Sequence, residues 1–90
     1  MAHHKSALKR VRQDAKRRAR NREVLGRMRT HVKQFRAALE SGDPAAAEKL
    51  RSAESVIRRA ASKGVIPSRR ASRHVARLTR ALNAASAQAE

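Results

Sequence analysis

The sequence predicts an all-α protein of one domain, residues 1–90: a three-helix bundle with a long, overhanging basic N-terminal helix. Three segments carry apolar residues at alternating steps of three and four, the spacing of a helix face that packs on other helices. Two short stretches with glycine and proline separate these segments, and no segment alternates as a strand does. Ninety residues suffice for one domain with a modest core.

The first helix is predicted over about residues 6–41, after a tail of residues 1–5. This helix has no proline and one glycine, and Ser6 is a residue type suited to its N-cap. Its first half has only a weak, alanine-rich apolar face, so we expect that half to project beyond the bundle. Its second half has a stronger hydrophobic face, formed by Leu25, Met28, Val32, Phe35 and Leu39.

The first turn is predicted at Ser41-Gly42-Asp43-Pro44. Gly42 suits the left-handed position after a helix, Asp43 suits an N-cap, and Pro44 suits the first helical position. A turn this short folds the next helix back antiparallel. That second helix is predicted over about residues 44–62, with a hydrophobic face of Ala46, Leu50, Ala53, Ile57 and Ala60.

The second turn is predicted at Lys63-Gly64, because Gly64 suits the position after a helix end. Pro67 and Ser68 then open a third helix, predicted over about residues 67–83, and residues 84–90 are expected to fray. The hydrophobic face of this helix consists of Ala71, Val75, Leu78 and Leu82. The predicted core across the three helices contains Phe35, Leu50, Ile57, Leu78 and Leu82.

The charge of the chain predicts a polyanionic partner. The formal net charge is +16, the sequence pI is about 12.0, and 17 of the 23 bases are arginine. Residues 57–82 hold eight bases and no acid, whereas a charged helix face that meets only water interleaves acids with bases. Arginine forks onto phosphate, which favours nucleic acid. Residues 37–56, with four acids and two bases, are the exception and should face water.

On charge alone, an anionic membrane is the second expected class of partner and an acidic protein the third, and the nucleic acid could also be DNA. A histone-like or nucleoid DNA-binding protein would carry the same excess of bases. An amphipathic helix on a membrane surface would need bulky apolar residues opposite the basic ones. The first half of the first helix offers only Leu8 and Val11 for that purpose, so no membrane partner is expected.

The sequence carries no catalytic constellation, and we expect no enzyme activity, cofactor or small-molecule substrate. There is no cysteine and no glycine-rich phosphate loop, and Phe35 is the single aromatic residue. His3 and His4, without a third ligand, do not predict a metal site. Without aromatic residues to stack on bases, recognition should use backbone phosphates and the shape of folded nucleic acid.

The order of several short segments resembles a known family. Lys5-Ser6-Ala7, Arg20-Asn21 and Gly42-Asp43 stand in the first half, and Ala60-Ala61-Ser62-Lys63-Gly64-Val65-Ile66 and Leu82-Asn83 stand in the second. In this order and spacing they resemble small-subunit ribosomal protein twenty of bacteria and organelles. The family commonly has His-Lys-Asn where this chain has Pro67-Ser68-Arg69.

The resemblance implies a cytoplasmic protein of the small ribosomal subunit that binds 16S ribosomal RNA directly and early in assembly, as a monomer. It implies contacts with the 5′ domain and with the long helix near the 3′ end. Two separated basic surfaces would let the protein hold two RNA segments together as a clamp. The expected rRNA-binding residues are Lys5, Ser6, Lys9, Arg10, Arg12, Gln13, Lys16, Arg17, Arg18, Arg20, Asn21, Arg29, Lys33, Lys63, Arg69, Arg70, Arg73, Arg77 and Arg80.

Overall fold

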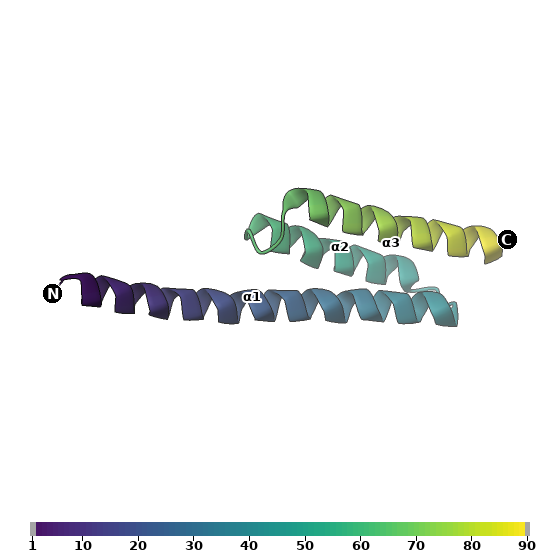
Figure 1. Cartoon of the computed structure of the whole chain (residues 1–90). Coiled ribbons are helices and arrows are strands. Elements are labelled where there is room, and N and C mark those ends of the chain that lie inside the picture. The colour runs from purple at the N-terminus through teal and green to yellow at the C-terminus, as the bar shows by residue number, and fades with distance from the viewer. Residues whose placement is uncertain (1, 90) are drawn as a thin grey trace.

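The computed structural model describes residues 2–89, which form three helices: α1 (Ala2–Ser41), α2 (Ala46–Ser62) and α3 (Ser68–Ala89) (Figure 1). The chain runs out along α1, returns along α2 and runs out again along α3, so consecutive helices are antiparallel (Figure 1). The overall extents are 71 × 22 × 13 Å, because α1 extends beyond α2 and α3 at its N-terminal end and α3 extends past the end of α1 on the opposite side (Figure 1). The prediction of an all-α, three-helix architecture is confirmed.

The outer helices are longer than predicted. α1 already includes residues 2–5, which were predicted as a tail, and α3 includes residues 84–89, which were expected to fray. Both segments lack glycine and proline and contain alanine, the strongest helix former, so no residue in them stops the helix. Ser6 therefore lies inside α1, and its prediction as the N-cap is wrong. Met1 and Glu90, the outermost residues of the two predicted tails, lie outside the described residues.

The first turn is closed by Gly42, whose φ of 68° is the left-handed conformation that glycine adopts without strain. The Asp43 N–H donates to the Ala38 carbonyl (2.9 Å) and the Gly42 N–H donates to the Leu39 carbonyl (3.3 Å), which is the Schellman pattern of a helix end. The Asp43 Oδ1 accepts from the Ala45 N–H at 2.8 Å within the turn, but the N-cap of α2 is Ala45, so the predictions of Asp43 as the N-cap and Pro44 as the first helical residue are wrong. α2 begins only at Ala46, two residues later than predicted, because Pro44 and Ala45 form a turn.

The second turn repeats this arrangement around Gly64, with a φ of 77°. The Val65 N–H donates to the Ala60 carbonyl at 2.9 Å, and the Gly64 N–H donates to the Ala61 carbonyl at 3.0 Å. After this turn Ile66 enters the core with 6% of its surface exposed, and α3 begins at Ser68. The turn and the start of α3 were predicted from the sequence, but the packing role of Ile66 was not.

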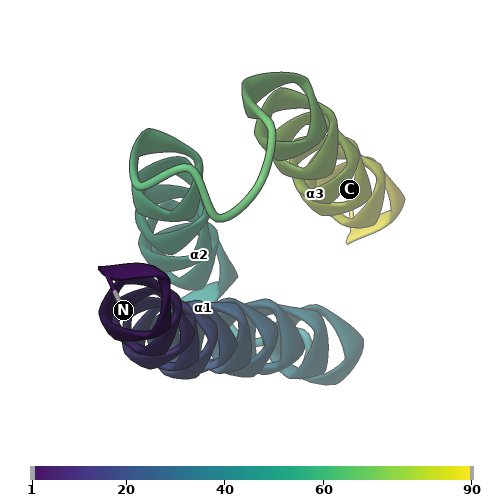
Figure 2. The same cartoon turned by 60° about the vertical axis from the view of Figure 1, so that its left-hand side comes forward.

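α2 lies between α1 and α3 and packs against both, while α1 and α3 diverge on the other side (Figure 2). The hydrophobic face predicted for α2 is buried in full, and Phe35 and Ile57 are the largest side chains with no exposure. Leu82 packs against the core but stays partly exposed. The buried cluster consists of Met28, Phe35, Ala38, Ala46, Leu50, Ala53, Ile57, Ala60, Ile66, Ala71, Val75 and Leu78.

Candidate nucleic-acid interface

The N-terminal part of α1 has no packing partner within the described chain over about five turns. Every side chain from His4 to Arg20 is exposed, and the first residues of α1 that pack against the core are Val24 and Leu25. Even the two large apolar residues of this part, Leu8 and Val11, are 57% and 64% exposed. We call residues 4–20 the overhang; Figure 1 shows it extending past the ends of α2 and α3.

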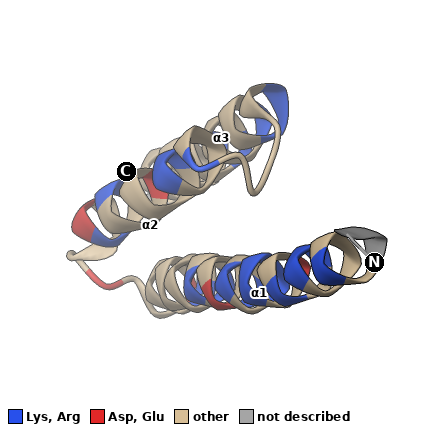
Figure 3. Ribbon diagram, turned by 90° about the vertical axis from the view of Figure 1, so that its left-hand side faces the viewer, with Lys and Arg blue, Asp and Glu red and all other residues tan. Residues whose placement is uncertain are grey.

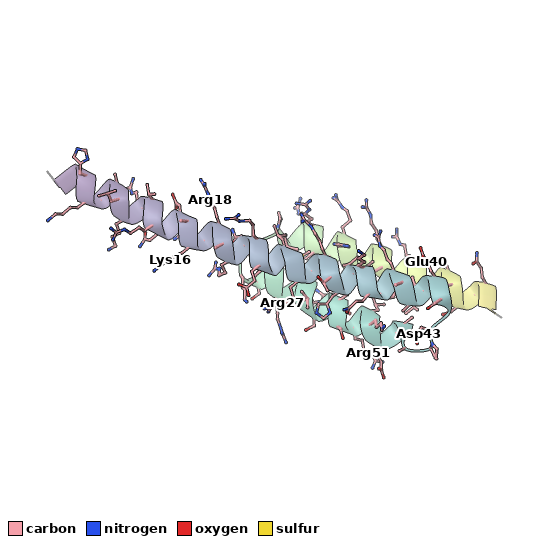
Figure 4. All side chains as sticks on the ribbon, turned by 90° about the horizontal axis from the view of Figure 1, so that it is seen from below. Lys16, Arg18, Arg27, Glu40, Asp43 and Arg51 are labelled. Carbon is pink, nitrogen blue, oxygen red and sulfur yellow. The ribbon has the colours of Figure 1, made fainter. Side chains whose placement is uncertain are left out.

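Most basic side chains of the overhang lie on one half of its circumference, at about 100° per residue, and Arg18 lies on the other half. In Figure 4 the side chains of Lys16 and Arg18 point away from the helix in opposite directions. An anionic partner can therefore bind the basic half of the helix and also reach Arg18 on the opposite side. The predicted residues on the overhang, all exposed, are Lys5, Ser6, Lys9, Arg10, Arg12, Gln13, Lys16, Arg17, Arg18 and Arg20; Asn21, just beyond it, is half-buried.

The second group of predicted residues lies on the packed part of the molecule. Lys63 is exposed at the C-cap of α2, and the five arginines of α3 are exposed along that helix. They do not form a single face. Arg70 and Arg77 lie at the edge of α3 that faces α1, since each lines a hollow together with residues of α1. The residues of this group on α3 are Arg69, Arg70, Arg73, Arg77 and Arg80.

A groove runs between α1 and α3, on the side where these helices diverge. Its main hollow has a volume of about 650 Å³. Aliphatic side chains and Met28 form its floor, and basic side chains of both helices form its walls. A second hollow continues it along α1 and α3, and Arg36 lines both. The main hollow is lined by Leu25, Met28, Val32 and Ile66 on the floor, by Arg29, Lys33 and Arg36 on the α1 wall, and by Arg70 and His74 on the α3 wall.

Arg36 and His74 were not among the predicted site residues. Both stand at positions that look like ordinary solvent-facing residues in the sequence, and only the divergence of α1 from α3 brings them to one groove. Burial lowers the pKa of the His74 imidazole, and the positive charges of Arg36, Arg77 and Arg70 lower it further. The groove is therefore a place where positive charge from two helices accumulates.

No predicted site residue forms an ion pair with an acid in the part of the chain that the structure describes. Within residues 2–89 the ion pairs join Glu23 to Arg27 (3.5 Å), Asp43 to Lys49 (3.9 Å) and Glu54 to Arg58 (3.0 Å). All three pairs involve partly exposed side chains, and such pairs contribute little to stability. The cations of the overhang and of the groove thus remain available for an external anion.

The acids are concentrated between the two basic regions. Figure 3 shows Lys and Arg along α1 and α3, with Asp and Glu mainly near the α1–α2 turn and on α2. α2 as a whole is not acidic, however, since Lys49, Arg51, Arg58 and Arg59 outnumber Glu48 and Glu54. The net acidic stretch of residues 37–56 covers the end of α1, the first turn and only the first part of α2.

Within residues 2–89, the structure contains neither a cluster of possible metal ligands nor a candidate membrane-spanning helix. Across residues 2–89, no three side chains of His, Cys, Asp or Glu gather as metal ligands would. In the same part of the chain, no helix combines the length and apolar content required to cross a bilayer.

Known proteins match the chain over nearly all of this structure. The model of the family described as ribosomal protein S20 matches residues 2–83. The small ribosomal subunit protein bS20 of Pelobacter propionicus is 50% identical over 84 residues, covering 92% of this chain and 97% of that protein. The bS20 protein of Geobacter metallireducens is 48% identical with the same coverage. That of Magnetococcus marinus is 56% identical over 79 residues, covering 87% of this chain and 86% of its own.

Proposed function

This chain belongs to the ribosomal protein S20 family, and we propose that its two basic regions bind folded 16S ribosomal RNA directly. Members of this family are structural constituents of the small ribosomal subunit and not enzymes, and the chain shares that role. We propose that the protein performs this structural role in the following way. Cations on the overhang and on α3 contact phosphates of separate RNA segments and hold those segments together during assembly.

The observation that carries the proposal is the overhang. A helix that exposes every side chain over residues 4–20 gains almost nothing from protein packing. Isolated helices of this length are marginal in water, so a partner has to stabilise this one. The partner must be anionic, because the overhang places eight Lys or Arg residues against Asp14 alone. These basic residues are Lys5, Lys9, Arg10, Arg12, Lys16, Arg17, Arg18 and Arg20, with Arg22 just beyond.

RNA suits this surface better than a flat anionic surface does. Lys16 and Arg18 point to opposite sides of the overhang (Figure 4), so a folded RNA that reaches around the helix engages both, whereas one face of a duplex or a membrane engages only one side. The nearly complete absence of aromatic residues supports recognition through phosphates and shape. We also propose that the protein acts within cytoplasmic ribosomes. It should act there as a monomer, because two chains of charge +16 repel each other.

A competition experiment tests the class of partner. Binding of the full chain to a 16S 5′-domain RNA is measured against duplex DNA of equal length across a salt series. If about 6–10 phosphates are neutralised, affinity should fall by roughly 10³–10⁵ between about 50 and 200 mM salt. The protein should bind the RNA more tightly than the duplex DNA at every salt concentration. Equal affinity for both nucleic acids would instead favour the histone-like or nucleoid alternative.

A further inference from the structure

We propose that the groove between α1 and α3 binds one unpaired nucleotide, with its base on the aliphatic floor and its phosphates between the two basic walls. This inference rests on the proposed function, since it specifies which part of an RNA one surface of the protein takes. The sequence predicts recognition only through backbone phosphates and the shape of the folded nucleic acid. A groove that binds a base would be an additional mode of recognition.

The floor offers an apolar surface that the fold leaves uncovered. Leu25 and Val32 on α1 are half-buried, while Met28 and Ile66 beneath them are 8% and 6% exposed. They stay accessible because α1 and α3 both pack on α2 but diverge from each other (Figure 2). The volume of about 650 Å³ lies within the ~300–1,000 Å³ of small-ligand sites. A base in a duplex keeps its faces stacked, so only an unpaired base can reach this floor.

The walls supply charge that matches the phosphates on either side of such a base. Arg29, Lys33 and Arg36 come from α1, and Arg70 comes from α3, with no acid among the residues that line the main hollow. Arg36 and Arg70 both act on His74 of the α3 wall, because their charges lower its pKa further after the larger effect of burial. Cations on two facing walls can bind the phosphates before and after one nucleotide.

An acidic amphipathic helix of another protein would also combine apolar and anionic groups. The composition of the walls favours the nucleotide. Three of the four fixed cations around the main hollow are arginines, whose planar guanidinium groups stack on bases and bind phosphates in a fork. Arginine planes thus provide the flat contact that the missing aromatic residues do not. A helical peptide would pack on the aliphatic floor, but it has no base on which the arginine guanidinium groups could stack.

Nuclear magnetic resonance on the full chain tests the proposal. The protein is titrated at fixed salt with a short single-stranded oligoribonucleotide and with the same strand carrying one central abasic residue. We expect nuclear Overhauser effects between base protons and the methyl groups of Val32 and Ile66. The affinity read from those methyl shifts should fall at least about fivefold for the abasic strand, the low end of base-stacking effects. Identical binding of the two strands at these methyls would overturn the proposal.

Matched substitutions distinguish binding in the groove from non-specific electrostatic attraction of RNA to the whole protein. Val32→Glu places a carboxylate on the floor, and Val56→Glu makes the same change at a half-buried position of α2 outside the lining of the groove. Only Val32→Glu should abolish the base contacts. If Val32→Glu does not fold, Lys33→Glu on the wall and Arg51→Glu on α2 form a second pair of solvent-accessible sites. Equal effects within the folded pair would refute the proposal.

Two further measurements distinguish the possible failures. An acidic helical peptide that displaces the oligonucleotide and itself contacts Val32 would show that the groove is a protein-binding site and overturn the nucleotide proposal. If Val32→Glu and Val56→Glu protect the same 16S nucleotides as the unaltered chain, the groove proposal fails while direct 16S binding stands. If the unaltered chain does not bind 16S RNA, the proposed function fails, and the base contacts with the oligonucleotide still decide the groove.

Discussion

Arg36 on α1 and His74 on α3 line the same groove, and the Arg36 charge adds to the effect of burial in lowering the pKa of the imidazole. Since the pKa of His74 in the folded state lies below its ordinary value of 6.5, the unfolded chain takes up the proton first as the pH falls. The contribution of His74 therefore leaves stability unchanged well above pH 6.5. It lowers the free energy of unfolding as the pH falls from 6.5 through the lower pKa of the folded state.

We predict that His74→Gln flattens the loss of stability between neutral and mildly acidic pH. Urea unfolding at several pH values measures it. Arg36→Gln should weaken the dependence only in part, because burial and the two α3 arginines Arg77 and Arg70 also act on His74. A His74→Gln variant with the full pH dependence would contradict this account.

The second prediction concerns the core. Ile57 is fully buried on α2, the helix that contacts both others, so Ile57→Ala should destabilise the protein by ~2–5 kcal/mol. Small domains have only about 5–15 kcal/mol in total, and this one has a modest core, so the variant should be largely unfolded at physiological temperature. Ile57→Val should cost about 0.5–1.5 kcal/mol. Val11→Ala, at a 64% exposed position, should melt like the unaltered chain in circular dichroism.

The three glycines should respond differently to alanine. Gly42 and Gly64 have φ values of 68° and 77°, so alanine there should cost roughly 1–2 kcal/mol in unfolding free energy. Gly26 lies inside α1, and an added Cβ would meet no atom within 4 Å. Gly26→Ala should therefore stabilise the protein by about 0.5–1 kcal/mol. A destabilised Gly26→Ala variant would contradict this account, because nothing around Gly26 should penalise an added methyl group.

The fourth prediction concerns the free protein. The overhang lacks packing contacts, so its amide hydrogens should exchange with solvent almost unprotected, while those of α2 and of residues 28–41 are protected. Trypsin should cleave first within residues 4–20 and leave a fragment that begins near Leu25. Binding of 16S RNA should protect the overhang in both assays. Equal protection of both halves of α1 in the free monomer would show that the overhang is stable by itself.

The hydrophobic spacing was sufficient to predict three helices and most of the core. Each predicted face maps onto one helix, and Gly42 and Gly64 mark both helix ends because few other residues adopt their conformation. The outer ends of α1 and α3 were misjudged because alanine-rich segments without a stop signal give no boundary. Ala38 and Ile66 were missed because burial at a helix end or in a turn depends on how the helices cross.

The candidate site was predictable where it depends on charge alone. The exposed cations of the overhang follow from a basic segment with a weak apolar face. The groove was not predictable, because it exists only where α1 and α3 diverge after packing on α2. The periodicity of the sequence assigns Leu25 and Val32 to a packed face of α1. It does not indicate that α3 leaves both side chains only half-buried. The sequence also does not indicate that Arg36 and His74 belong to one site, because they meet only where α1 and α3 diverge.

The last prediction tests whether the protein holds two RNA segments together. The overhang and α3 are separate basic surfaces, with the acids concentrated near the α1–α2 turn (Figure 3). One variant reverses the charges of Arg12, Lys16, Arg17 and Arg20 on the overhang. The other reverses Arg69, Arg73, Arg77 and Arg80 on α3. All of these residues are exposed and none has an ion pair within the described chain, so both variants should remain folded.

Each variant should bind 16S RNA more weakly, because each removes phosphate contacts. Hydroxyl-radical footprints should differ between them: the overhang variant should lose protection in one RNA segment and the α3 variant in another. At higher protein concentration each variant should still protect the segment that its intact surface contacts. A clamp requires this independence, since either surface has its own RNA partner. If both variants lose protection at the same nucleotides, the protein binds one RNA element through one continuous surface, and it does not act as a clamp.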